Sequence, residues 1–245
     1  MNRQHLVMIS GWAHSSSALS PLADILGKSF DIHATSPAEL LSTASADKCL
    51  QEGLSPYASA LRDLIQRIND PCIVLGWSMG AMITLEALAG RTMNVKKVIA
   101  VSPTARFCAT DGYTCGFAEQ NLRTLKKSIK RNPTKALEQF FHALSFPRTV
   151  SHHGVNESTK TALSTGADVL IHGLDYLLTM DLRTSLAGIA VPVLLIHGRQ
   201  DRIIPWQAGE FIRQQMPDSR LVVYEDAGHG ILHTHARKIA SEIQP

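Results

Sequence analysis

Residues 72–80 read Cys-Ile-Val-Leu-Gly-Trp-Ser-Met-Gly, a short apolar run that ends in a G-x-S-x-G pentapeptide. The apolar run predicts a buried strand, and the residues after it predict a helix, so that Ser78 falls on a sharp turn between the two. Glycine at positions 76 and 80 removes side chains that would collide with neighbouring backbone in such a turn. The segment therefore predicts a serine nucleophile on a strand-to-helix turn.

Short runs of β-branched and aliphatic residues recur on both sides of this stretch and alternate with longer segments of helical periodicity. This alternation predicts an α/β fold with a mostly parallel central sheet flanked by helices, in one structural domain of 245 residues. The predicted strands span residues 6–10, 30–34, 72–76, 95–101, 191–197 and 221–224. The predicted sheet-covering helices span residues 56–69, 79–88 and 207–216.

Strand signals stop between residues 102 and 186, where helical periodicity takes over. Because this segment is too long for a plain connection, we interpret 102–186 as a helical cap inserted into a core made of 1–101 and 187–245. Asn132 and Pro133 are typical of the N-cap and first turn of a helix. The helix before them has an apolar side and a basic side, with Lys126, Lys127, Lys130 and Arg131 on the basic side.

Positive charge is concentrated in this cap. The net charge is only +3, which argues against a nucleic-acid-binding protein, yet residues 123–148 contain seven Lys or Arg residues and one acid. The basic residues that we expect to contact a partner are Arg123, Lys126, Lys127, Lys130, Arg131 and Arg148. A concentrated basic face favours an acidic partner.

The composition indicates an ordinary globular protein, with 44% hydrophobic and 18% charged residues. Its apolar runs are much shorter than the roughly 20 residues that a membrane helix needs, and the first residues lack the features of a secretory signal, so we expect a cytoplasmic protein without membrane contact. The four cysteines are scattered, which favours reduced thiols. We expect no metal and no cofactor, because the pair His152 and His153 lacks further ligands at suitable spacing.

A serine is a poor nucleophile by itself and requires a base and a group that orients the base. Asp201 follows the strand predicted at 191–197, and His229 follows the last predicted strand. His233 and His235 are rival bases, but they fall in or near the terminal helix, so we assign the base to His229. The chain order Ser, Asp, His is that of the α/β-hydrolases.

A serine nucleophile also requires donors for the oxyanion that forms on attack. We expect the backbone N–H groups of Met79 and Trp12, the first at the helix start and the second in the loop after the first strand. Trp12, Trp77 and Phe140 are predicted to contact the substrate, although a core position is an equally good interpretation of Phe140.

With Gly11-Trp12, the turn at 76–80, Asp201 and His229, the sequence resembles the carboxylesterases of the biotin pathway, the BioH-type pimeloyl-[acyl-carrier protein] methyl ester esterases of the α/β-hydrolase superfamily. The resemblance spans most of the chain and is most specific in residues 173–183 and in Gly-Trp-Ser. It is weaker at 36–53, where Ser-Pro-Ala-Glu-Leu replaces the usual D-x-P-G-x-G-x-S loop.

The resemblance implies an α/β-hydrolase fold with a helical cap and a Ser-His-Asp esterase. Its substrate would be a pimeloyl methyl ester carried on acyl carrier protein, which the family recognises through basic residues of the cap. Two other enzyme functions are alternatives: a general short-chain carboxylesterase without carrier dependence, and an acyltransferase. A third alternative is a non-catalytic ligand-binding protein of the same fold.

Overall fold

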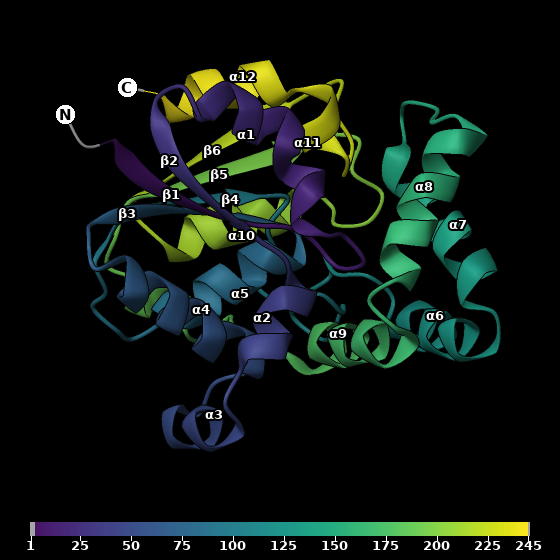
Figure 1. The fold of residues 1–245 in the computed structure, drawn as a ribbon, viewed down its shortest axis with the longest axis horizontal. Coiled ribbons are helices and arrows are strands. Elements are labelled where there is room, and N and C mark those ends of the chain that lie inside the picture. Colours follow the sequence, from purple (N-terminus) through teal and green to yellow (C-terminus); the bar gives the residue numbers. More distant parts are fainter. Residues whose placement is uncertain (1–2, 245) are drawn as a thin grey trace.

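The computed structural model describes residues 3–244 and contains a six-stranded sheet in the order β2-β1-β3-β4-β5-β6 (Figure 1). Every pairing between neighbouring strands is parallel, which confirms the predicted fold class. The strands are β1 (Gln4–Ile9), β2 (Phe30–Thr35), β3 (Cys72–Trp77), β4 (Val95–Val101), β5 (Val193–Gly198) and β6 (Ser219–Tyr224). The predicted strands overlap all six, with ends that coincide or differ by at most two residues.

Helices cover both faces of the sheet, because alternate residues of a buried strand point to opposite sides. Val7 and Ile9 of β1 belong to one core, whereas Leu6 and Met8 belong to the other. The helices on the first face are α2 (Pro37–Thr43), α4 (Pro56–Ile68), α5 (Met79–Leu88) and α10 (Gln207–Gln215). The second face is covered by the short 3-10 helix η1 (Ser16–Leu19) and by α1 (Ser20–Leu26), α11 (Ile231–Thr234) and α12 (Ala236–Ile243).

The three predicted sheet-covering helices are present. α5 has the predicted bounds, and α4 and α10 each end one residue earlier than predicted. The structure adds short helices that the sequence analysis did not predict, among them α1, α2 and the protruding α3 (Ala46–Glu52). Ser55 begins α4 as expected, since its side chain accepts a hydrogen bond from the N–H of Ala58.

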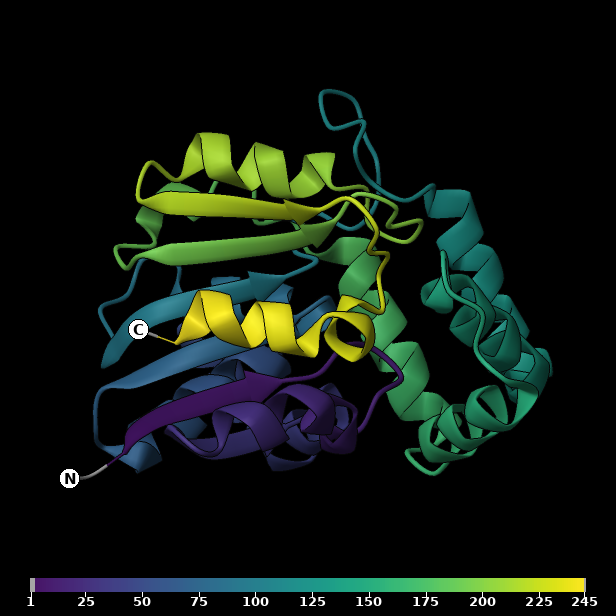
Figure 2. The same ribbon diagram turned by 90° about the horizontal axis from the view of Figure 1, so that it is seen from above.

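Four helices between β4 and β5 form the cap at one end of the sheet (Figure 2). They are α6 (Glu119–Arg131), α7 (Pro133–Ser145), α8 (His152–Leu163) and α9 (Ala167–Thr179). Asn132 caps α7 through a hydrogen bond from the N–H of Lys135. The division into a core (1–101 and 187–245) and a cap (102–186) stays our interpretation; its second boundary lies at the 3-10 helix η2 (Leu186–Gly188).

Within residues 3–244, no helix has the length and apolar composition needed to cross a membrane. The cysteines at 49, 72, 108 and 115 are unpaired, in agreement with the predicted thiols.

Candidate active site

Ser78 lies on the turn between β3 and α5, with φ 56° and ψ −118°. A positive φ is uncommon for a serine, and it marks the strained turn that the pentapeptide predicts. A Cβ on Gly76 would lie 2.3 Å from the Gly80 oxygen, and a Cβ on Gly80 would lie 2.5 Å from the Ile9 oxygen. Only glycine fits these two positions, because the obstructing atoms belong to the backbone.

His229 lies within hydrogen-bond distance of both other predicted triad residues. The Ser78 hydroxyl donates to His229 Nε2 over 2.9 Å, and His229 Nδ1–H donates to Asp201 Oδ2 over 2.7 Å. Ser78 follows β3, Asp201 follows β5 and His229 follows β6, so all three are placed by loops at the carboxyl ends of parallel strands. The geometry suits proton transfer from the serine to the imidazole.

The Asp201 carboxylate is buried and has four hydrogen-bonding or ionic neighbours. Its Oδ1 accepts the N–H groups of Ile203 and Ile204, at 2.8 and 2.9 Å. Its Oδ2 lies 3.5 Å from Nε2 of the buried His197 as well as against His229. Burial by itself raises the pKa of Asp201, but the charge and hydrogen bonds of His229 and His197 outweigh it and leave the pKa below its usual range. The carboxylate therefore remains ionised beside the imidazole.

The loop that carries His229 is held from the core and from the cap. The indole N–H of Trp77 donates to the His229 carbonyl over 3.1 Å. The N–H of Gly230 donates to the Leu144 carbonyl of α7 over 3.2 Å. The two bonds hold the same peptide group, the one that joins His229 to Gly230.

The predicted oxyanion donors flank Ser78. Met79 is the first residue of α5, so its N–H has no acceptor within the helix. The loop after β1 passes close to the serine, because a Cβ on Gly11 would lie 3.7 Å from Ser78 Oγ. In the same loop a ring N–H of His14 donates to the Trp12 carbonyl over 2.8 Å. The role of Met79 and Trp12 as oxyanion donors stays a prediction, which this placement supports.

Two of the three predicted substrate contacts lie together, and the third lies apart. Trp12 and Phe140 form an edge-to-face pair with ring centroids 4.8 Å apart, and the Trp12 indole N–H donates to the Leu170 carbonyl of α9. Trp77 has no exposed surface and packs behind His229. A role for Trp77 in substrate contact would require its neighbours to move, so that assignment stays a prediction.

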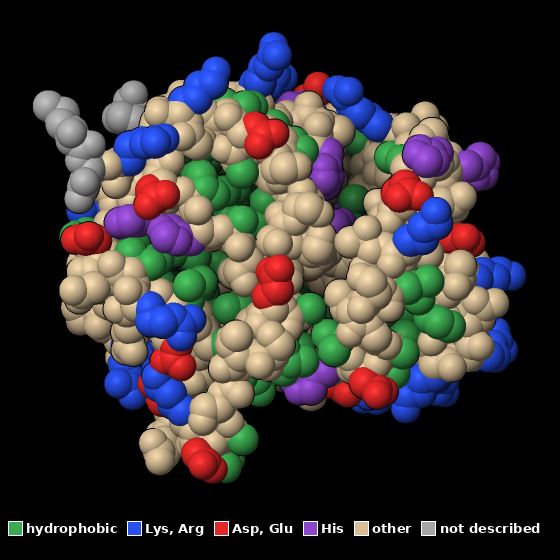
Figure 3. Space-filling view, in the orientation of Figure 1, with side chains coloured by type: hydrophobic (Ala, Val, Ile, Leu, Met, Phe, Trp, Pro, Cys, Tyr) green, Lys and Arg blue, Asp and Glu red, His purple; other side chains and the backbone are tan. Residues whose placement is uncertain are grey.

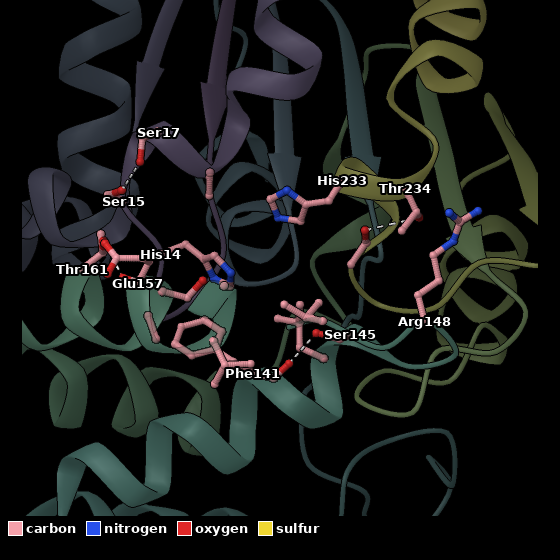
Figure 4. A pocket seen from close by; sticks show the side chains of 18 of the residues that line it. His14, Ser15, Ser17, Phe141, Ser145, Arg148, Glu157, Thr161, His233 and Thr234 are labelled. Atoms are coloured by element: carbon pink, nitrogen blue, oxygen red, sulfur yellow. Dashed lines mark hydrogen bonds between the residues drawn. The ribbon is translucent and has the colours of Figure 1, made fainter. Parts of the chain in front are cut away.

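A cleft of about 450 Å³ opens between the core and the cap (Figure 4). It reaches Gly230, the residue after His229, but Ser78, Asp201 and His229 are not among its lining residues. Its lining includes His14 from the loop after β1, Phe141 from α7, Arg148 after α7 and His233 from α11. Burial lowers the pKa of His14 to about 3, although its hydrogen bond to Trp12 opposes the shift, and burial also lowers the pKa of His233. Both imidazoles are therefore neutral at pH 7, and the charged side chains of the lining are Arg148 and Glu157.

The predicted carrier-binding residues divide into two groups. Arg148 lies on the rim of the cleft, whereas the other five belong to α6, where Lys and Arg side chains gather at the lower right of Figure 3. Arg123 pairs with Glu119 at 2.7 Å, and Lys126 pairs with Asp175 of α9. The other three basic residues of α6, Lys127, Lys130 and Arg131, are exposed.

Three further histidines surround the site: the sequence analysis did not name His14 and His197, and it considered His233 only as a rival base. His14 supports the Trp12 peptide, His197 lies against Asp201, and His233 lines the cleft. Their signal is their position, because each lies within five residues of a predicted site residue. His197 is near the end of β5, His14 is in the loop after β1 and His233 is in α11.

Comparison of the chain with known proteins identifies its family. A family model described as alpha/beta hydrolase fold matches residues 4–236. The pimeloyl-[acyl-carrier protein] methyl ester esterase of Nitrosomonas europaea is 27% identical over 232 residues, which cover 93% of this chain and 89% of that protein. The enzyme of the same name from Neisseria meningitidis serogroup B is 30% identical over 186 residues, which cover 75% of this chain and 72% of that protein.

Solved structures show the same fold at lower identity. An esterase from Exiguobacterium antarcticum superimposes with a TM-score of 0.84 and 22% identity, covering 99% of this chain and 91% of that chain. The enol-lactonase from Burkholderia xenovorans LB400 gives a TM-score of 0.77 at 17% identity, covering 99% of this chain and 90% of that chain. The similar proteins are named esterases and hydrolases, in agreement with the predicted enzyme class, and the chain belongs to the alpha/beta hydrolase family.

Proposed function

We propose that this chain is a serine carboxylesterase that hydrolyses the methyl ester of pimeloyl-[acyl-carrier protein] in the synthesis of the biotin precursor. The observation that carries the proposal is the hydrogen-bonded chain Ser78–His229–Asp201, with bonds of 2.9 and 2.7 Å. The substrate assignment rests on the relatives, which are named for that activity and align with most of this chain.

The mechanism follows from the direction of the hydrogen bonds. His229 Nε2 takes the hydroxyl proton as Ser78 Oγ attacks the ester carbonyl, and Asp201 holds the imidazole in the tautomer with hydrogen on Nδ1. The oxyanion is stabilised by the N–H groups of Trp12 and Met79. Cleavage of the C–O bond releases methanol, which takes the proton from His229. A water molecule then attacks the acyl-enzyme carbonyl and gives a proton to His229. The bond to Ser78 Oγ breaks, Ser78 regains its proton from His229, and the product leaves with a free carboxyl group.

The cleft between the core and the cap supports the binding of an acyl chain. Its volume of about 450 Å³ lies within the range of ordinary ligand sites, and its lining combines apolar Phe141, Leu144 and Val155 with neutral imidazoles. Arg148 on its rim and the exposed basic residues of α6 would attract an acidic carrier. Lysine supplies charge without the bidentate geometry of arginine, which favours steering over tight pairing at α6.

The test is to incubate the purified chain with the methyl pimeloyl carrier and to follow release of methanol by the mass of the carrier. We expect turnover that Ser78→Ala lowers by about 10³-fold or more in kcat, because the triad acts as a unit. An equal kcat/KM on a free short-chain methyl ester, without any effect of salt on the carrier substrate, would favour the general carboxylesterase instead.

A further inference from the structure

Three side chains with metal-ligating atoms meet at the amino ends of β1 and β2, away from the triad. β1 and β2 pair in parallel with His5 opposite Asp31, and His33 follows Asp31 by two residues. Residues that pair in register, and residues two apart in a strand, lie on the same face of a sheet. The alternation of the two strands therefore brings His5, Asp31 and His33 to one surface, although 26 to 28 positions separate His5 from the other two.

The ligating atoms of these residues form a compact triangle. His5 Nδ1 lies 2.9 Å from His33 Nε2 and 3.3 Å from Asp31 Oδ2, and His33 Nε2 lies 3.9 Å from Asp31 Oδ2. In a tetrahedral site with metal–ligand distances of about 2.0–2.1 Å, two ligand atoms are separated by about 3.3–3.4 Å. The three observed separations bracket this value, so shifts of about half an ångström would make them equal.

The surroundings of the triangle favour a cation over a simple hydrogen bond. A hydrogen bond between the two rings joins only His5 Nδ1 and His33 Nε2 through one proton. A metal ion at the centre of the triangle would instead bind both nitrogens and the Asp31 oxygen. Asp70 Oδ2 lies 3.7 Å from His5 Nε2, the nitrogen that faces away from the triangle. A carboxylate on the second nitrogen is the usual partner of a metal-bound histidine.

The cluster is also accessible from solvent. The side chains of His5, His33 and Asp31 are 20%, 32% and 58% exposed, and histidine and acidic side chains lie side by side at the left of Figure 3. A hydrated ion can therefore reach the three ligand atoms and keep water in a fourth position.

We propose that His5, Asp31 and His33 bind one divalent transition-metal ion of the Zn²⁺ class and that the ion links the edge strand β2 to β1. Two imidazoles and one carboxylate suit Zn²⁺ better than Mg²⁺ or Ca²⁺, which prefer oxygen ligands. The sequence analysis expected no metal, because these residues are separated along the chain and come together only through strand pairing. The site is independent of the proposed esterase activity, since Ser78 lies at the opposite, carboxyl end of the strands.

The experiment titrates Zn²⁺ into the chelator-treated full chain, without a polyhistidine tag, by isothermal calorimetry. We expect one ion per chain and a midpoint of thermal unfolding raised by several degrees, because an ion that binds only the folded state stabilises it. His33→Gln should weaken binding at least tenfold and abolish the thermal shift. His153→Gln on α8 is the matched control, an exposed histidine outside the triangle, and should leave both unchanged.

Absence of stoichiometric binding to the wild-type chain would overturn the proposal. Equal affinity in the His33→Gln variant would also overturn it, because the ion would then bind elsewhere. Hydrolysis of a small ester by the wild-type chain should change less than twofold between the chelated and the Zn²⁺-loaded protein. A strong dependence on Zn²⁺ would contradict the assigned location without bearing on Ser78.

Discussion

The loops around the triad and the helices of the cap are built in different ways. Around Ser78, hydrogen bonds of 2.7 to 2.9 Å join buried side chains, and backbone atoms approach so closely that only glycine fits at 76 and 80. In the cap, α6 buries Leu122 and Ile129 and exposes Lys127, Lys130 and Arg131. The first region requires particular residues, whereas the second requires only a pattern of apolar and charged positions.

This difference predicts how the two regions respond to substitution. A change in the triad loops should affect turnover of every ester, because it alters the reacting groups or the turn that positions them. A change on the exposed face of α6 should affect only a substrate that contacts this face.

Asp201→Asn should cause the largest loss. An amide cannot hold the imidazole in the tautomer that accepts the serine proton, and kcat should fall by about 10⁴-fold, or about 5.5 kcal/mol. Steady-state hydrolysis of a small chromogenic ester measures the loss, with circular dichroism as a check on folding. A folded variant with kcat within tenfold of wild type would show that Asp201 does not orient His229.

Gly76→Ala should damage the turn that carries Ser78. The added Cβ would lie 2.3 Å from the Gly80 oxygen, so the backbone must shift at a cost of about 3 kcal/mol. Urea unfolding should report this loss of stability. Gly53→Asn serves as a control, because Gly53 has φ 64° with open space around it and asparagine tolerates this conformation. Equal stability of Gly76→Ala and wild type would contradict the steric argument.

Acid should destabilise the folded chain through His14. His14 has a folded-state pKa of about 3 against 6.5 for the unfolded chain, so between these values only the unfolded state binds the proton. Stability is therefore unaffected by His14 above pH 6.5 and falls as the pH drops toward 3. The loss should be on the order of 2 kcal/mol at pH 4.5.

The variant His14→Gln keeps a donor for the Trp12 carbonyl without a titrating group, so it should lose less stability between pH 7 and 4.5 than wild type does. Denaturant unfolding at both pH values measures the difference. His153→Gln, on the exposed surface of α8, should behave as wild type. An unchanged pH dependence in His14→Gln would contradict the assigned burial.

Reversal of the exposed charges on α6 should have the smallest effect. The triple substitution of Lys127, Lys130 and Arg131 by Glu should lower kcat/KM for the carrier substrate by about tenfold, or about 1.4 kcal/mol, through weaker electrostatic steering. Turnover of a small ester should stay within twofold. Lys28→Glu, an exposed lysine outside the cap, is the control. An equal effect on both esters would remove α6 from the carrier interface.

The sequence predicted the parts of the site that depend on local residue types. Gly76 and Gly80 indicate the turn without any knowledge of the rest of the fold, and the order of Ser78, Asp201 and His229 follows from the strands that precede them. Contacts between residues far apart in the sequence could not be predicted. The bonds from Trp77 to the His229 carbonyl and from Gly230 to Leu144 depend on how the cap and the loops pack. The triangle of His5, Asp31 and His33 depends on the register of two strands.

The most direct test of the catalytic assignment is labelling with a fluorophosphonate, followed by mass mapping of the modified peptide. Covalent phosphonylation should occur once per chain, on Ser78, and His229→Ala should slow it by about 10³-fold or more, because the serine depends on its base. Modification of another residue, or labelling of Ser78 at the same rate without the imidazole, would contradict the assignment of Ser78 as a nucleophile activated by His229.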